Sequence, residues 1–234
     1  MTKFFLSAIL IGGIWAAATG EVYLEGPRRS ARPRGKAVPE RAFRELVDAK
    51  DLMTEPVVCN GVRTELKTSL IRRPLAELLD ELRSRYPDIK FTVRRGGVLF
   101  SIRLGDRRRE RVLLVGTGDR VTCFAMLLPD PMPKLPAWPR ELPPLPDGAA
   151  PDEIIEFPGN GGVYGSFSGA GPGALSRTAA ALAADGYAPV TREAHSPIGR
   201  GELFLNAARQ RMVTLSIGPD GTGTMYLAPL SSPK

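Results

Sequence analysis

The sequence is short of the residues that most enzymes use for chemistry. It contains one histidine, His195, and two cysteines, Cys59 and Cys123, among 234 residues. Hydrolytic triads and most zinc sites need histidine beside partners of defined geometry. No segment matches a known cofactor or metal motif. We therefore expect a non-enzymatic protein with no catalytic residues, no metal site and no cofactor.

A hydrolase that pairs Cys123 or Ser168 with His195 is the disfavoured alternative, because His195 lies in a stretch that is typical of a loop between strands. The glycine-rich stretch 159–173 precedes a predicted helix, where glycines can cradle a phosphate. It fits neither the dinucleotide fingerprint nor the P-loop, and it lacks the P-loop lysine. We interpret it as a strand entry and a turn.

Long apolar runs are also missing, except at the start of the chain. Residues 1–20 read MTKFFLSAILIGGIWAAATG. Lys3 precedes an apolar stretch, which three alanines follow as a small-residue cleavage site. A membrane-spanning helix needs about 20 apolar residues, and this run is shorter. We predict that residues 1–18 form a signal peptide and that the protein is periplasmic or secreted. The alternative is an inner-membrane anchor through residues 4–18.

Proline and glycine are abundant and concentrate in two stretches. Residues 19–55 combine proline, glycine and arginine without an apolar period, which predicts a basic flexible tether. Phe43, Leu46 and Val47 indicate a short helix within it. Residues 129–158 contain ten prolines, which favour a semi-rigid linker. The alternative for this stretch is a docking segment for an aromatic-lined groove.

Residues 56–128 read as one α+β module. A short strand-like run, 56–62, precedes a predicted helix in which four leucines recur with the spacing of one apolar face, Leu75, Leu78, Leu79 and Leu82. Strands are predicted at 90–94, 98–104, 112–115 and 121–128.

Residues 159–234 repeat this order, with a strand at 162–168, a helix after Pro172 and strands at 188–192, 202–206, 212–217 and 224–230. We therefore predict two small related modules in an α+β fold. Each would have a strand, a helix and three strands, which a fourth strand completes, with the helix on an antiparallel-rich sheet.

The two cysteines suggest a disulfide between Cys59 and Cys123, because an exported protein meets an oxidising compartment. Such a bond would contribute roughly 4 kcal/mol on the chain-entropy model. Two buried thiols are the alternative.

The excess of basic over acidic residues lies in the first module. The net charge is +7, and residues 61–128 alone hold 15 basic and 8 acidic residues. The candidate anion-binding residues are Arg94, Arg95, Arg103, Arg107, Arg108, Arg109 and Arg111. A solvated hairpin tip would explain the same cluster.

We expect a non-enzymatic scaffold or accessory protein of a bacterial-type envelope assembly, with a protein partner in the envelope. Open strand edges of small sheets offer one way to bind such a partner. The alternative is a module that binds an anionic lipid, glycan or other envelope polymer through the basic first module. Export makes a nucleic-acid partner improbable.

Overall fold

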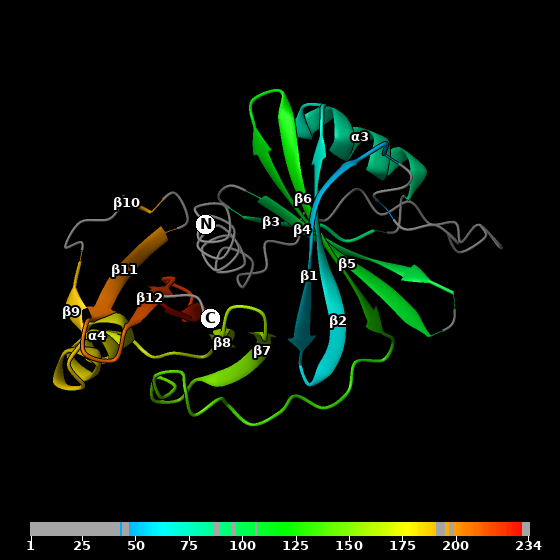
Figure 1. The fold of residues 1–234 in the computed structure, drawn as a ribbon. Helices are drawn as coiled ribbons and strands as arrows, with labels where there is room; N and C mark the ends of the chain where they lie inside the picture. The colour runs from blue at the N-terminus through cyan, green and yellow to red at the C-terminus, as the bar shows by residue number, and fades with distance from the viewer. Residues whose placement is uncertain are drawn as a thin grey trace. The chain divides into compact units, whose positions relative to one another are not determined.

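The computed structural model describes residues 43, 47–86, 89–94, 97–105, 107–190, 195–196 and 199–230. The predicted signal peptide, 1–18, and most of the predicted tether lie outside the described residues. The fold is sheet-rich α+β, with mostly antiparallel strands and two helices, as Figure 1 shows. The chain divides into two compact units. In the described part, unit 1 holds 56–63 and residues from 133 onward, and unit 2 holds the remainder.

Unit 2 contains a strand hairpin, a helix and four further strands. The elements are β1 (Lys50–Cys59), β2 (Val62–Ile71), α3 (Leu75–Arg85), β3 (Thr92–Arg94), β4 (Gly97–Leu104), β5 (Arg108–Thr117) and β6 (Arg120–Pro129). The strands pair in the order β1-β2-β6-β5-β4-β3. The tip of the β1–β2 hairpin, Pro56–Arg63, belongs to unit 1.

The helix of unit 2 covers one face of its sheet. Leu78 and Leu82 are buried, one turn apart, because leucines at this spacing share a helix face. They pack with Phe100 and other apolar side chains of the sheet in one core. Gly116 of β5 allows the close approach of α3, since a Cβ there would lie 3.1 Å from the Cβ of Leu75.

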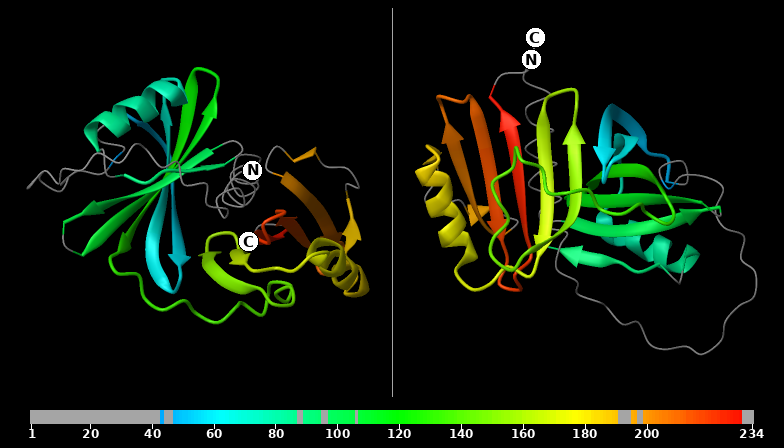
Figure 2. Two further views of the ribbon diagram at one scale, coloured as in Figure 1. Left: turned by 180° about the vertical axis from the view of Figure 1, so that it is seen from behind. Right: turned by 90° about the horizontal axis from the view of Figure 1, so that it is seen from below.

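Unit 1 has the same order of elements after its own hairpin. They are β7 (Ala150–Phe157), β8 (Gly162–Ser168), α4 (Ala174–Ala184), β9 (Ala188–Pro189), β10 (His195–Ser196), β11 (Gly199–Asn206), β12 (Arg211–Ile217) and β13 (Gly223–Pro229). The strands pair in the order β10-β11-β12-β13-β8-β7, and β9 also pairs with β11. Figure 2 shows α4 along one face of this sheet.

The proline-rich stretch 129–158, predicted as a linker, is largely part of unit 1. Its last residues form β7, which pairs with β8 along its length. Leu142 is buried in the core beside α4, and the indole N–H of Trp138 donates a hydrogen bond to the Pro143 carbonyl at 2.8 Å. The segment therefore contributes a strand and core side chains to this unit.

The first predicted strand, 56–62, also differs from the structure, which has a turn inside it. Asn60 and Gly61 form the turn of the β1–β2 hairpin, with φ of 49° and 80°. Asn-Gly favours this two-residue turn because both residues tolerate positive φ. The hairpin therefore extends to Lys50 on one side and to Ile71 on the other.

Among the residues that the structure describes, no helix combines the length and the apolar character needed to cross a membrane.

Candidate functional site

The predicted arginine cluster divides into different environments. Arg94 lies in β3, and Arg95 lies outside the described residues. Arg107 and Arg108 are exposed at the β4–β5 turn. The remaining members sit on paired strands, where β4 and β5 bring Arg103 opposite Arg109, and Arg111 is half-buried.

Asp130 holds two of these arginines. The Nε of Arg103 and the Nη2 of Arg109 each donate to one carboxylate oxygen, at 2.7 and 2.8 Å. The Asp130 side chain is only 9% exposed, and the Asp130 backbone N–H donates to the Arg107 carbonyl. Asp130 thus balances one of the two positive charges, and Arg103 stays exposed, as Arg107 and Arg108 are at the turn.

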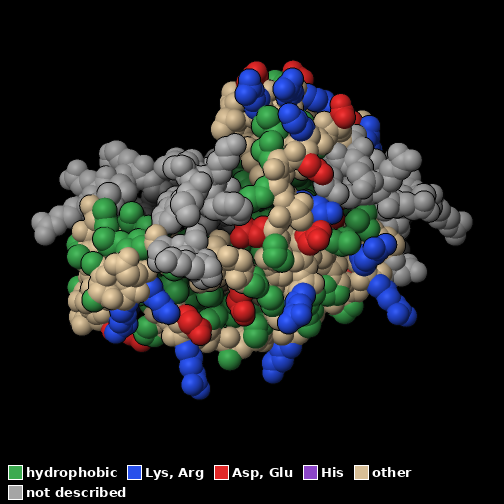
Figure 3. Space-filling view, in the orientation of Figure 1, with side chains coloured by type: hydrophobic (Ala, Val, Ile, Leu, Met, Phe, Trp, Pro, Cys, Tyr) green, Lys and Arg blue, Asp and Glu red, His purple; other side chains and the backbone are tan. Residues whose placement is uncertain are grey.

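Three further arginines of unit 2 form ion pairs with acidic residues of α3. Glu81 accepts from Arg73 at 2.6 Å and from Arg85 at 2.8 Å, and Asp80 accepts from Arg83 at 3.3 Å. In Figure 3, basic side chains gather over the end of the molecule that carries α3, with acidic side chains among them. The composition of this module therefore does not translate into one uniformly positive face.

The predicted disulfide is absent from the structure, where Cys59 and Cys123 are separate buried thiols. Cys123 lies in the core of unit 2, on β6, where it pairs with Ser69. Cys59 lies in unit 1, pairs with Ile155, and its thiol donates to the Glu153 carboxylate at 3.7 Å. The two residues belong to different strand ladders and different units, which is why they do not meet.

The residues of the disfavoured hydrolase lie on three different strands, Cys123 on β6, Ser168 on β8 and His195 on β10. Cys123 is fully buried in unit 2, whereas Ser168 and His195 belong to unit 1. The Ser168 hydroxyl donates to the Asp152 carboxylate at 3.0 Å. His195 lies in the short strand β10, opposite Arg200. Within the described ranges, no cluster of His, Cys, Asp and Glu has the arrangement of a metal site.

Strand β4 has an open edge in the described part of the chain. All of β4 pairs with β5, but β3 pairs only with Gly97 to Leu99. Residues 100–104 therefore have a strand neighbour on one side only, among the residues described. In this stretch the exposed side chains are Ser101 and Arg103, while the intervening residues point into the core.

A cavity of about 570 Å³ lies within unit 1. No sequence pattern indicates it, because its walls come from three distant segments. These are residues 140–147, helix α4 with the residues just after it, and the β11–β12 connection, in which Arg209 lies in the turn and Arg211 begins β12.

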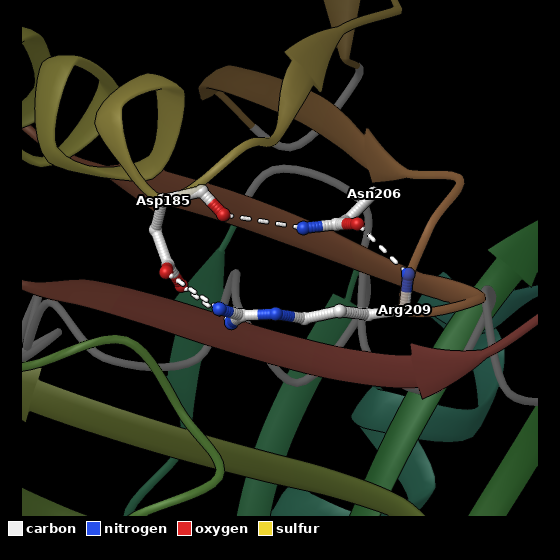
Figure 4. A network of polar contacts seen from close by, with 3 residues as sticks. All are labelled: Asp185, Asn206 and Arg209. Carbon is white, nitrogen blue, oxygen red and sulfur yellow. Dashed lines mark hydrogen bonds and ion pairs between the residues drawn. The ribbon is translucent and has the colours of Figure 1, made fainter.

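The turn beside the cavity is fixed to the end of α4, as Figure 4 shows. Arg209 donates to both carboxylate oxygens of Asp185, at 2.8 and 2.9 Å. The Asn206 side chain donates to the Asp185 carbonyl and accepts from the Arg209 backbone N–H. Gly186, with φ of 84°, ends the helix, so that the Tyr187 N–H bonds back to the Leu182 carbonyl.

These contacts also stabilise the charged form of the Arg209 guanidinium. The hydrogen bonds and the negative charge of Asp185 raise the pKa of the Arg209 guanidinium above its usual range, with a smaller contribution from Tyr187. Arg209 is therefore a fixed cation whose charge Asp185 balances. No sequence pattern indicated that this arginine binds at the end of α4.

No protein-family model, curated protein or solved structure matches this chain.

Proposed function

We propose that this chain is an exported, non-enzymatic accessory protein of a bacterial-type envelope assembly, which binds a partner protein at the open edge of β4. The observation that carries the proposal is the unpaired edge of residues 100–104 in the described structure. Such an edge presents backbone donors and acceptors to which an extended segment of a partner can add as a strand.

The matching order of elements in the two units supports a duplicated origin. Each unit has a hairpin, a helix and then strands that return toward the hairpin, and its helix packs on one face of the sheet. We infer that the units are two copies of one ancestral module. Stacked or repeated small modules are common in proteins that bind others without catalysis.

Site-specific photocrosslinking tests the proposal. A benzoylphenylalanine at Ser101, on the β4 edge, should crosslink one envelope protein in living cells. The same residue at Ser176, which is exposed on α4, is the matched control and should not capture that protein. Equal capture at both positions, or capture of lipid alone at Ser101, contradicts docking at the β4 edge.

Export is a separate part of the proposal. The lysine, apolar stretch and alanines of residues 1–18 support passage into the periplasm or the medium. Amino-terminal sequencing of the protein from cell fractions should give a chain that begins at Thr19. A chain that retains residues 4–18 in the membrane fraction would support the anchored alternative, and a cytosolic full-length chain would refute export.

The second candidate function is the binding of an anionic envelope polymer or lipid. It rests on Arg107 and Arg108, which are exposed and have no ion pair among the described contacts. Replacing both with glutamate should abolish retention on phosphatidylglycerol vesicles, and retention by the unaltered chain should fall steeply with salt. The pair Arg72→Glu and Lys134→Glu changes the net charge equally and should leave retention in place.

A further inference from the structure

The cavity in unit 1 has an apolar floor. Leu142, Ala174, Leu182 and Tyr187 line it and are all buried. Its volume, about 570 Å³, lies in the range of small-molecule sites, which are mostly apolar with a few placed polar groups.

Its wall on the proline side is held in place from within the fold. The Leu142 N–H donates to the Pro139 carbonyl at 3.3 Å, and Trp138 packs edge-to-face on Phe167. The prolines at 143, 144 and 146 restrict the backbone of this wall. A cavity with such a wall requires little reorganisation when a ligand enters.

Arg211 is the unusual charge of this cavity. It lies on β12, where every second residue points to the same face, and the next two residues on its face are Val213 and Leu215. Both of these pack in the core with α4. The same alternation places Arg211 on the helix-facing side of the strand. It is half-buried, and within the described part of the chain it has no carboxylate partner. A half-buried guanidinium with no carboxylate partner can pair with an anion that enters the cavity.

Of the arginines that line the cavity, Arg211 and Arg140 have neither an ion pair nor a side-chain hydrogen bond among the described residues. Arg209 is balanced by Asp185, and an Nη of Arg177 donates to the Pro172 carbonyl at 2.8 Å. Arg140 is exposed at the mouth and has no ion pair in the described structure. Two acidic residues of the lining, Glu141 and Asp147, are also exposed at the rim.

We propose that this cavity binds a small amphiphilic organic anion. Its apolar body would lie on Leu142, Ala174 and Leu182, and its carboxylate, phosphate or sulfonate would meet the Arg211 guanidinium at the inner end and Arg140 at the mouth. Arginine suits this role because its planar group pairs with such oxyanions through two parallel hydrogen bonds. The site lies wholly in unit 1 and is independent of the β4 edge, which belongs to unit 2.

Two fluorescent probes test the charge requirement. Anilinonaphthalene sulfonate carries one negative charge, and N-phenylnaphthylamine has nearly the same apolar body without it. The full chain should bind the sulfonate at least about tenfold more tightly than the neutral probe, the ratio that one charge-assisted contact supplies. Arg211→Gln should remove that preference and leave binding of the neutral probe unchanged.

Three controls locate the binding. Arg108→Gln removes an exposed arginine of unit 2 and should change neither affinity. Ala181→Trp places a large side chain on an exposed, cavity-lining position of α4 and should weaken both probes. If Arg211→Gln unfolds, Arg140→Gln should reduce the sulfonate preference in a folded protein. Equal binding of both probes by the unaltered chain, or a sulfonate affinity that neither arginine changes, overturns the proposal.

Discussion

At the scale of single residues, Asp130 decides how the arginines of unit 2 behave. Arg103 and Arg109 face each other on neighbouring strands and would repel each other without an anion between them. Asp130 accepts a hydrogen bond from each and is almost fully buried in doing so. Two of the arginines that the sequence suggested for anion binding therefore already share a carboxylate within the protein.

Replacing Asp130 with asparagine should therefore destabilise the protein. We expect a loss of about 1–2 kcal/mol in the free energy of unfolding, because two charge-assisted hydrogen bonds are lost and two like charges remain. Urea unfolding of the variant and the unaltered protein measures this difference in unfolding free energy. Asp119→Asn is the control, since Asp119 is 83% exposed and 3.7 Å from Arg120, and should cost less than about 0.5 kcal/mol. Equal effects would show that Asp130 does not hold the pair.

Two glutamates of unit 2 should give the stability opposite pH dependences. Burial raises the pKa of Glu55 above its ordinary value of 4.5. The hydrogen bond and charge of Arg73, aided by Arg85, lower the pKa of Glu81 below the same value despite partial desolvation. As the pH falls, Glu55 is therefore protonated at a higher pH in the native state than in the unfolded chain, and Glu81 is protonated at a lower pH.

Glu55→Gln should raise the free energy of unfolding at pH 7, because the buried charge is removed. The gain should shrink as the pH falls through the raised pKa toward 4.5, where the native Glu55 is already neutral. Glu81→Gln should lower stability at pH 7, and that loss should vanish as the pH falls below 4.5 through the lowered pKa. The measurement is urea unfolding between about pH 3 and 8, a range that spans the ordinary carboxyl pKa values. A change of the unfolding free energy in the same direction for both variants would contradict the assignment.

Residue identity alone could not assign these roles. The sequence indicates that residues 61–128 are rich in arginine, and a charge count is all that composition provides. Whether Arg103 has a carboxylate partner within the protein depends on Asp130, which is 27 residues away and comes close only through the pairing of β4, β5 and β6. Arg211 escaped notice for the same reason, since its partners in the cavity come from separate segments.

At the scale of elements, periodic patterns predicted most of what the structure has. The leucines of α3 recur at helical spacing, and all four lie within Leu75–Arg85. Strands were predicted at 98–104, 202–206, 212–217 and 224–230, and β4, β11, β12 and β13 lie close to these bounds. These signals are local, which is why sequence alone could detect them.

The missed elements are those whose pattern depends on tertiary contacts. Proline density concealed β7, because the segment before it looks like an extended linker by composition. What folds that segment onto unit 1 is the contact of Trp138 and Leu142 with Gly165, a glycine of β8 without a side chain. Asn60-Gly61 is a local signal for the β1–β2 hairpin, and it lies inside the segment that was predicted as one strand, 56–62.

Gly165→Ala should test how firmly the proline segment packs. A Cβ at this position would overlap the Trp138 ring and lie 2.9 Å from Leu142, and the backbone of β8 cannot retreat. We expect a loss of about 2 kcal/mol in urea unfolding.

Gly171→Ala is the matched control, because the nearest atom to its Cβ would be Arg177 Nη2 at 3.9 Å. It should be neutral or slightly stabilising. A neutral Gly165→Ala would mean that residues 133–149 do not pack on β8.

At the scale of the whole molecule, the division into two units governs the sulfur chemistry. The cysteines were expected to bridge because there are two of them in a chain with a predicted export signal, which is an argument from compartment alone. Pairing needs the Cα atoms within about 7 Å. The hairpin tip that carries Cys59 pairs with β7 in unit 1, while Cys123 pairs inside unit 2, and no sequence pattern announces that separation.

The protein purified without reductant should therefore contain two thiols. In the native state both are buried and should react slowly with a thiol reagent such as dithiobisnitrobenzoate; in guanidinium chloride two thiols per chain should react. The variants Cys59→Ser and Cys123→Ser should each retain one. Because the residues share no contact, their effects on the free energy of unfolding should add to within about 0.5 kcal/mol. A bridged protein would instead show no thiols in denaturant, and the second substitution would then cost little beyond the first.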